Sequence, residues 1–365
     1  MLPQYFMIEN KLKSIIIGMT LHNLLLLLPP EIAHSLVIMI LKKIPYKKPI
    51  EHLPESLNVN FFDNKLKSPI GLAAGFDKNA EVISSMLSFG FGFIEAGTVT
   101  KYPQYGNKKP RIFRLTQDEG IINRLGFNNK GIGYFLKQIN KIRLNNDIFG
   151  INIGKNSISQ NKISDYIDLI KMVHGKSNYI VLNISSPNTP NLRNLHNKQE
   201  LSELLKSITL ARQSINSSKY TPIMLKISPD IDQQTKENIA ELALEYKIDG
   251  LVVSNTTVNR DNLYFHYNES GGLSGRPLFK LSTELLSDMY KLTKGKMLLI
   301  GCGGISSGID AYKKIKAGAS LVQLYTALIY HGPQIVNKIN LELAELIRRD
   351  GLSNISEAVG CDCEF

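Results

Sequence analysis

The chain has 365 residues, of which 43% are hydrophobic and 21% are charged, and its formal net charge at pH 7 is +11. This apolar content excludes a disordered or fibrous protein, and the length suits one large domain with an appendage. Three cysteines are too few for a disulfide framework, which favours a reducing compartment. The positive surplus favours an anionic partner such as lipid, a charged substrate or nucleic acid.

The first fifty residues predict two amphipathic helices. Residues 14–30 contain no Asp, Glu, Lys or Arg, but the run is short and diluted by polar side chains for a membrane span, and no signal-peptide cleavage site follows it. After Pro29 and Pro30, apolar residues recur at helical spacing from Ile32 to Ile44. Two arrangements stay open. The helices either pack on the protein body or lie in a membrane interface, with lysines toward anionic headgroups: Lys11, Lys13, Lys42, Lys43, Lys47 and Lys48.

Between Ile70 and Tyr330 the sequence repeats one unit, a short apolar run followed by a longer helical or loop segment. Near-continuous apolar strands alternating with helices predict a parallel sheet that is covered on both faces. Eight units over this length predict an α/β fold of the (β/α)8 TIM-barrel type, with a doubly wound open sheet as the alternative. The runs are Ile70–Ala74, Gly92–Ala96, Phe149–Ile153, Tyr179–Ile184, Pro222–Ile227, Gly250–Ser254, Met297–Ile300 and Leu321–Leu324.

Almost every run ends in residues suited to chemistry, and in a barrel these ends meet on one face. Gly303-Gly304 and Tyr325-Thr326 follow the seventh and eighth runs, where barrels commonly bind a phosphate through backbone N–H groups. Lys226 lies in an apolar run, where a buried ammonium needs an anionic partner. Several asparagines at these ends indicate a planar heterocycle with imide-like edges: Asn123, Asn128, Asn152, Asn183, Asn188 and Asn255.

The sequence lacks the motifs of metal-dependent hydrolysis and of nucleotide hydrolysis. No HExxH, paired CxxC or Walker-type loop is present, and the histidines show no ligand spacing, so no metal site is expected. Cys361-Asp362-Cys363 resembles half of a metal site, but its position at an acidic C-terminus predicts a mobile tail instead.

The chain closely resembles the class 2, quinone-linked dihydroorotate dehydrogenases in a series of motifs that follow one another in the same order. The resemblance runs from about Pro29 to Gly332. It rests on GLAAGFDKN (Gly71–Asn79), GTVT (Gly97–Thr100), INRLGFNN (Ile122–Asn129), GINIGKN (Gly150–Asn156), NISSPNT (Asn183–Thr189), SNTT (Ser254–Thr257), GGLSGRP (Gly271–Pro277) and AGASLVQ (Ala317–Gln323).

The resemblance implies an FMN-binding barrel that oxidises dihydroorotate to orotate and passes the electrons to ubiquinone or menaquinone. Carried over residue by residue, it implies flavin contacts at Ala74, Gly75, Phe76, Asp77, Lys78, Thr98, Asn152, Asn183, Lys226, Ser254, Gly275, Gly304, Tyr325 and Thr326. The implied substrate contacts are Lys78, Asn123, Arg124, Leu125, Gly126, Phe127, Asn183, Asn188, Asn255 and Thr256. Ser254 stands where threonine is common in the family, Phe76 where leucine is more usual and Cys302 where an apolar residue is common.

The same resemblance makes Ser186 the catalytic base, where soluble class 1 enzymes use cysteine. It also implies that the N-terminal helices form a quinone entrance at the membrane surface, bordered by Arg114 and Tyr325. We therefore expect a membrane-associating segment at residues 1–48, a catalytic barrel at 49–340 and a C-terminal helix and tail at 341–365.

Two other functions would each explain part of the sequence. A tRNA-acting dihydrouridine synthase, also an FMN barrel, relies on a catalytic cysteine, and none ends the third or fourth run here. A basic, non-enzymatic membrane scaffold leaves Ser186, Lys226 and the asparagines unexplained. We expect no nucleic-acid partner, and a peripheral protein on the cytoplasmic side of a bacterial inner membrane.

Overall fold

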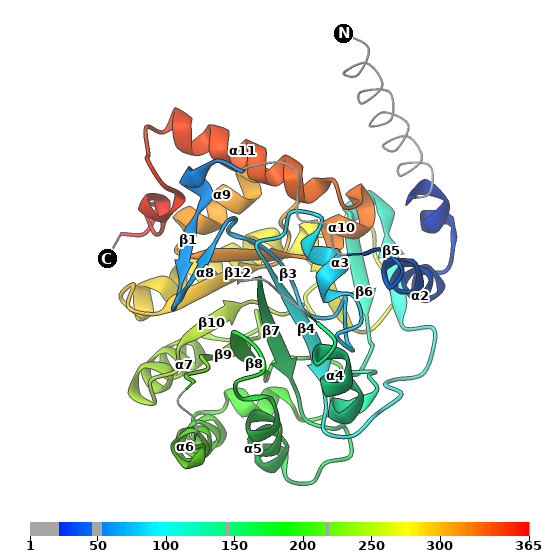
Figure 1. Cartoon of the computed structure of the whole chain (residues 1–365), viewed down its shortest axis with the longest axis vertical. Helices are drawn as coiled ribbons and strands as arrows, with labels where there is room; N and C mark the ends of the chain where they lie inside the picture. Colours follow the sequence, from blue (N-terminus) through cyan, green and yellow to red (C-terminus); the bar gives the residue numbers. More distant parts are fainter. Residues whose placement is uncertain (1–21, 46–52, 143–146, 217–218, 365) are drawn as a thin grey trace.

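A closed barrel of eight parallel strands forms the centre of the protein (Figure 1). The computed structural model describes residues 22–45, 53–142, 147–216 and 219–364. Each of the eight apolar runs supplies one strand, which confirms the (β/α)8 prediction and excludes the open sheet. Around the barrel the order is β10 (Gly250–Val253), β12 (Leu298–Cys302), β13 (Leu321–Leu324), β3 (Ile70–Leu72), β4 (Phe93–Val99), β7 (Ile148–Ile153), β8 (Tyr179–Asn183) and β9 (Ile223–Ile227).

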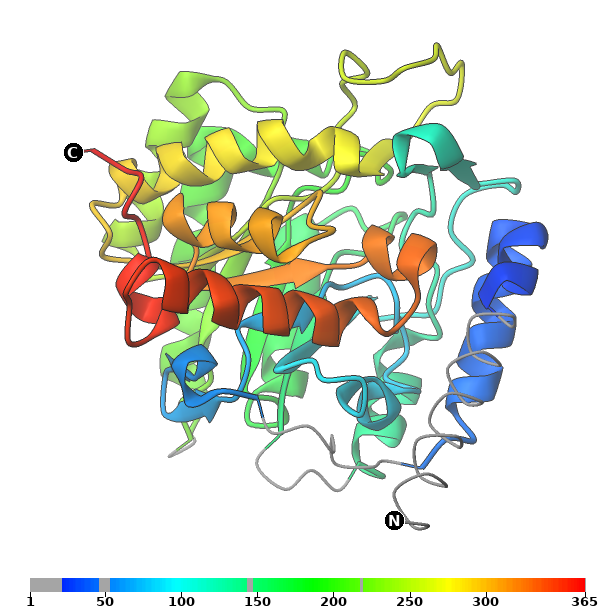
Figure 2. The same ribbon diagram turned by 90° about the horizontal axis from the view of Figure 1, so that it is seen from above.

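Helices surround the barrel on its outer side, as the two perpendicular views show (Figures 1 and 2). Several begin at a polar residue whose side chain accepts a hydrogen bond from the first turn, namely Asn161, Asn197, Asp232 and Ser307. The helices are α3 (Ile83–Leu87), α4 (Gly131–Ile139), α5 (Lys162–Val173), α6 (Lys198–Ser214), α7 (Gln233–Glu245), α8 (Phe279–Leu292), α9 (Gly308–Lys316), α10 (Thr326–His331) and α11 (Ile335–Arg349).

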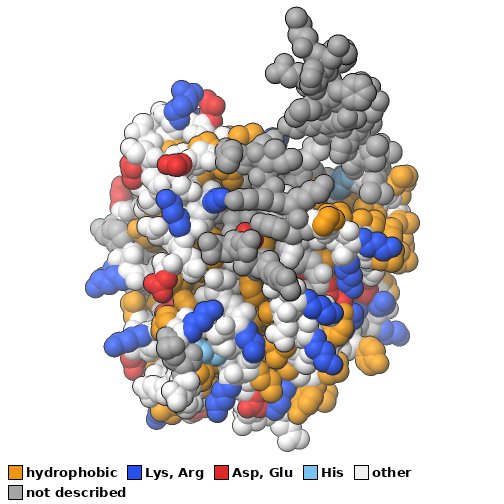
Figure 3. Space-filling model, viewed as in Figure 1, with side chains coloured by type: hydrophobic (Ala, Val, Ile, Leu, Met, Phe, Trp, Pro, Cys, Tyr) orange, Lys and Arg blue, Asp and Glu red, His pale blue; other side chains and the backbone are white. Residues whose placement is uncertain are grey.

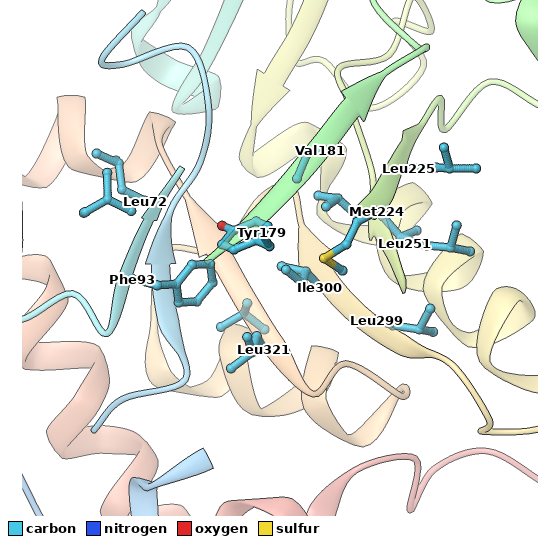
Figure 4. Packing of buried hydrophobic residues seen from close by; sticks show 14 of the residues in the cluster. Leu72, Phe93, Tyr179, Val181, Met224, Leu225, Leu251, Leu299, Ile300 and Leu321 are labelled. Atoms are coloured by element: carbon cyan, nitrogen blue, oxygen red, sulfur yellow. The ribbon is translucent and has the colours of Figure 1, made fainter. Parts of the chain in front are cut away.

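The strands bury both of their faces, which explains their near-continuous apolar sequences. Leu225, Leu251 and Leu299 are in register on β9, β10 and β12 and point away from the barrel axis (Figure 4). Inside, Phe93 and Tyr179 lie near one another, with ring centroids 6.3 Å apart. A hairpin of β1 (Val59–Phe61) and β2 (Asn64–Leu66) adds Phe61, whose ring contacts both. Aromatic rings therefore fill this end of the barrel.

A three-stranded antiparallel sheet was not foreseen from the sequence. It consists of β5 (Ile112–Leu115), β6 (Gly120–Asn123) and β11 (Gly272–Gly275), in the order β11-β6-β5. The pairing of β6 with β11 joins segments that are far apart in the chain, so no local pattern announces it. Helix α2 (Pro30–Leu41) packs against β5.

The second of the two expected N-terminal helices is confirmed as α2, which begins at Pro30, directly after the predicted break. Residues 22–27 are also helical, and the remainder of the first expected helix lies outside the described residues. Within the described residues no helix has the length and apolar character needed to cross a membrane.

The prediction of a mobile C-terminal tail is wrong for the described residues, which end at 364. The backbone N–H groups of Gly360 and Asp362 donate to carbonyls at the end of α9, the Asp362 carboxylate lies 2.8 Å from Lys316 Nζ, and Cys363 is buried. Local composition predicted mobility, but these long-range contacts fasten the segment to α9.

The interior offers a matched test of packing. A Cβ added to Gly150 on β7 would lie 2.2 Å from the Tyr179 ring, whereas one added to Gly133 on the exposed side of α4 has nothing within 4 Å. We expect Gly150→Ala to lower the free energy of unfolding by about 1–3 kcal/mol through overpacking. Gly133→Ala should raise it by about 0.5–1 kcal/mol through helix propensity. Urea denaturation measures both, and equal effects would contradict this account of the interior.

Candidate active site

A cavity of about 630 Å³ extends from the carboxyl ends of the barrel strands to the inner face of α2. Most residues proposed from the sequence line it, so the expected convergence on one pocket is observed. These are Ala74, Gly75, Phe76, Lys78, Thr98, Asn123, Leu125, Gly126, Phe127, Asn183, Ser186, Asn188, Lys226, Ser254, Asn255, Thr256, Gly275, Gly304, Tyr325 and Thr326.

Three of the flavin and substrate contacts implied by the resemblance do not line the cavity, and neither does Asn128. The buried Asp77 carboxylate accepts hydrogen bonds from the backbone N–H groups of residues 79, 81 and 82, so it fixes the turn after β3. Asn152 is fully buried behind the wall and supports its neighbours. Arg124 forms an ion pair with Glu269, 2.6 Å away, and its guanidinium lies over the Phe113 ring. These three positions support the cavity from outside.

Asn152, Asn183 and Asn255 form one connected amide network across strand ends, whereas Asn188 is hydrogen-bonded to Asn123 separately. Thr98 Oγ1 donates to Asn152 Oδ1 at 2.6 Å and accepts from Asn183 Nδ2 at 2.9 Å. Asn255 Nδ2 donates to Asn183 Oδ1 at 3.1 Å and to Ser185 Oγ at 2.9 Å. Because each amide is held by its neighbours, the edges turned toward the cavity are fixed in orientation before a ligand binds.

A buried carboxylate lies beneath this network and was missed in the sequence. Glu95 Oε1 accepts from Asn152 Nδ2 and its Oε2 accepts from Gln323 Nε2, both at 2.7 Å. Gln323 Oε1 is buried with no hydrogen-bond partner within the described part of the chain. The available signal was a charged residue and an amide inside otherwise apolar strands, at positions 95 and 323. Gln323 lines the cavity, so a ligand with an N–H group at its edge would satisfy that oxygen.

Lys226 is the cation expected in this pocket. It lies on β9, beside Asn183 on β8 in the strand register, and is 5% exposed. Its ammonium makes no hydrogen bond or ion pair with any residue that the structure describes, and it lines the cavity. A buried ammonium without a protein partner is costly. The site therefore favours a ligand that places negative charge there.

The glycines near β11, β12 and α8 form a cradle of bare backbone at the cavity wall, where a Cβ would clash with the neighbouring backbone. At Gly304, with φ +77°, a Cβ would lie 2.6 Å from the Phe279 backbone nitrogen at the start of α8. At Gly275, with φ +91°, a Cβ would lie 2.2 Å from the Glu119 carbonyl oxygen. Bare backbone next to the positive end of a helix is a suitable site for a phosphate.

Ser186 lies in a loop that follows β8 and is fastened on several sides. Its Oγ accepts a hydrogen bond from the Asn188 backbone N–H at 3.3 Å, and the side chain is 7% exposed. Asn107 Nδ2 donates to the Asn188 carbonyl, and Arg193 Nε donates to the Ser185 carbonyl. These contacts hold the Ser186 hydroxyl at the cavity wall.

Lys78 is the second cation that lines the cavity, and it is half-buried. Its Nζ donates to the Gly75 carbonyl at 2.6 Å. Burial and the nearby Arg111 guanidinium lower the pKa of Lys78 to about 8. Burial and the Lys78 charge also lower the pKa of His34, on α2, to about 3, so this imidazole is neutral at pH 7.

The half of the cavity next to α2 is apolar, and two arginines hold its helices in place. Arg111, not singled out in the sequence, donates from Nη2 to Glu31 Oε1 at 2.6 Å, which ties α2 to the chain just before β5. Arg114 Nη1 donates to the carbonyls of Leu26 and Leu28 at 2.8 and 2.7 Å and so caps the helical residues 22–27. Apolar residues lining this half include Leu25, Leu26, Ala33, Val37, Ile40, Leu41, Met86, Phe89, Leu328 and Pro333.

Polar residues from many strand ends of a closed parallel barrel define a barrel enzyme with its active site on the carboxyl face. The sequence profile of the dihydroorotate dehydrogenase family matches residues 56–347, and the chain belongs to this family.

Similar proteins carry descriptions of the same family. The chain is 47% identical to "Dihydroorotate dehydrogenase (quinone)" of Parvibaculum lavamentivorans, over 93% of this chain and 97% of that protein. It is 43% identical to the mitochondrial protein of that description from Oryza sativa subsp. japonica, over 92% and 78% of the two chains. Among solved structures, Eimeria tenella DHODH in complex with ferulenol superposes with a TM-score of 0.88 at 39% identity, covering 92% of this chain and 96% of that one.

Enzymes of this family depend on FMN, and the residues here fit that cofactor. The buried Gln323 oxygen, the Lys226 ammonium and the asparagine edges complement the polar rim of an isoalloxazine ring, and the cradle at Gly275 and Gly304 suits its phosphate.

Proposed function

We propose that this chain catalyses the FMN-dependent oxidation of (S)-dihydroorotate to orotate, with a membrane quinone as electron acceptor, in pyrimidine biosynthesis. One observation carries the proposal: a single cavity joins a polar half, with Ser186, Lys226 and the asparagines, to an apolar half beneath α2. The first half suits a small anionic heterocycle, and the second suits an apolar quinone. No cysteine lies at Ser186 or its neighbours, so nothing favours the tRNA-acting alternative.

Bound FMN supplies the hydride acceptor and later the electron donor to the quinone. We assign Lys226 to the edge of the flavin where negative charge develops on reduction, because its ammonium is buried and has no counter-ion among the described residues. Thr98, Asn183 and Ser254 would contact the ring, while Gly275, Gly304, Tyr325 and Thr326 would surround the phosphate arm. Asn152 and Asp77 act indirectly, through the contacts described above.

On the substrate side, Asn123, Asn188, Asn255 and Thr256 would read the imide edges of dihydroorotate, and Lys78 would pair with its carboxylate. Ser186 would accept the C5 proton while hydride leaves C6. Serine is a weak base, but the Asn188 N–H donates to Ser186 Oγ and so stabilises negative charge that develops on that oxygen.

The N-terminal helices present apolar residues on two faces. Leu25, Leu26 and Val37 line the cavity, whereas Leu24, Leu27, Ile32 and Met39 are exposed on the outside. Hydrophobic side chains gather over this part of the surface (right side of Figure 3). A surface of this kind suits insertion into a membrane interface, with the cavity opening toward the quinone.

The membrane role of residues 1–48, the division at 49–340 and 341–365, and a location on the cytoplasmic side of a bacterial inner membrane remain predictions. Of the lysines expected to face headgroups, Lys42 forms an ion pair with Glu81 at 2.8 Å, and Lys43 is exposed. Lys11, Lys13, Lys47 and Lys48 lie outside the described residues.

The activity has a direct spectroscopic test. We expect the purified protein to show the absorbance of bound FMN, to be bleached by dihydroorotate without oxygen, and to recover its colour on addition of a quinone analogue. Fumarate and NAD should not restore the absorbance. A colourless protein, or a flavin that dihydroorotate does not bleach, would contradict the proposed function.

Ser186→Ala tests the base. Removing the hydroxyl takes away the proton acceptor and leaves the flavin cradle intact, so dihydroorotate should bleach the flavin at least about 10²-fold more slowly. Stopped-flow absorbance measures this half-reaction. Flavin content and the rate of reoxidation by quinone serve as internal controls and should not change. A variant that bleaches at the wild-type rate would place the base elsewhere.

The outer face of the N-terminal helices can be tested separately from the cavity. Leu27→Glu combined with Ile32→Glu puts charge on side chains that are 81% and 58% exposed and should weaken binding to anionic liposomes. Ile158→Glu, at an 89% exposed position on the loop after β7, is the matched control. Deleting residues 1–44 should also slow quinone reduction while sparing flavin bleaching by dihydroorotate. Unchanged cosedimentation of the double variant and the truncated chain with liposomes would refute the membrane role.

A further inference from the structure

Lys314 is a fully buried lysine that the proposed chemistry leaves unused. It lies on α9, outside the barrel wall, and its side chain is 0% exposed. Its Nζ donates to Ser282 Oγ at 2.8 Å and to Thr283 Oγ1 at 2.9 Å, both on α8, and lies over the Phe279 ring. All three partners are neutral. Among the described residues no carboxylate forms an ion pair with this ammonium.

The Lys314 ammonium lies directly behind the glycine cradle. Ser282 Oγ, which accepts from Lys314, lies 3.1 Å from the Gly303 carbonyl and donates to it. A Cβ on Gly301 would lie 3.2 Å from Lys314 Cδ, and one on Gly304 would lie 2.5 Å from Phe279 Cα, at the start of α8. Lys314, Ser282 and the Gly303-Gly304 backbone are thus consecutive layers between α9 and the cavity.

A buried charge needs a counter-charge, and here the protein supplies none in contact. The nearest anion that the site is built to accept is the cofactor phosphate, on the other side of the glycine backbone. We propose that Lys314 is a positioning residue for the FMN phosphate, whose charge it balances through Ser282 and the Gly303-Gly304 backbone without touching it. This inference rests on the proposed function, because it requires FMN in the cradle.

Protonation supports the same assignment. Without the phosphate, burial lowers the pKa of Lys314 to about 7, and the groups that face it are Cys302 on β12 and Asp310 on α9. Burial raises the pKa of the Cys302 thiol, which therefore stays neutral near pH 7. A bound phosphate dianion stabilises the ammonium, so FMN binding takes up a proton above pH 7. FMN affinity should consequently fall as the pH rises from about 7 to about 9, while the affinity for riboflavin, which has no phosphate, should not follow this dependence.

The test compares FMN with riboflavin in the full chain. Lys314→Met keeps the length and removes the charge, and Ser282 and Thr283 keep their own bonds to the carbonyls of Phe279 and Gly303. We expect FMN affinity to fall by about tenfold or more and riboflavin affinity to stay within about twofold. Lys316→Met is the matched control, since Lys316 lies on the same helix and pairs with Asp362. It should change neither affinity.

Dissociation constants come from flavin fluorescence on dilution of the holoprotein, with riboflavin exchanged into protein stripped of FMN. Wild-type protein that holds no flavin would defeat the proposed function itself. Wild-type protein that binds FMN, with a Lys314→Met variant that loses FMN and riboflavin equally or loses neither, would overturn the role of Lys314 alone. If Lys314→Met does not fold, the Ser282→Ala variant and the pH dependence of FMN affinity in the wild-type protein take its place. Unchanged FMN affinity in Ser282→Ala, together with a wild-type affinity that does not change with pH, would also overturn the role of Lys314.

Discussion

Buried ammonium groups without carboxylate partners are the constraint on which this site depends. Lys226 and Lys314 both lie near Cys302 in the barrel wall, and the half-buried Lys78 lies at the turn after β3. Each ammonium costs free energy in the ligand-free protein, because burial removes its hydration and no ion pair compensates for that loss. A ligand with negative or electron-rich groups recovers that cost, so the charge distribution favours an anionic ligand.

The barrel makes this concentration of charge possible. One end of its interior is filled by Phe61, Phe93 and Tyr179, so apolar packing holds the strands there. Above them, Glu95 holds Asn152 and Gln323 by hydrogen bonds. The polar floor is therefore built from fixed amides on a rigid base. An arrangement of this kind orients a ring without reorganising during the reaction.

The barrel strands could be predicted because strands buried on both faces leave a strong local signal, and Leu321–Leu324 matches β13 in both limits. Contacts between residues that are far apart in the chain could not be predicted, because they leave no local pattern in the sequence. The pairing of β6 with β11 depends on residues about 150 positions apart, and the tail is held by α9 in a way that local composition opposes. Asp77 was assigned to the flavin on resemblance, but its carboxylate is occupied by backbone N–H groups. Lys314 was overlooked because it stands among Lys313 and Lys316, which together look like a solvated face.

The two halves of the cavity meet at a row of rings. His34 on α2 contacts Phe76 edge to face at 5.4 Å, and Phe76 contacts Tyr325 at 5.7 Å. Tyr325 follows β13, so these rings connect the N-terminal helix to the barrel rim. Since burial and Lys78 keep His34 neutral, this imidazole adds no positive charge to the half next to α2. Charged substrate and apolar acceptor can then occupy adjoining compartments of one cavity, because Lys226 lies at the barrel strands, whereas the Arg114 guanidinium next to the N-terminal helices already donates to the Leu26 and Leu28 carbonyls.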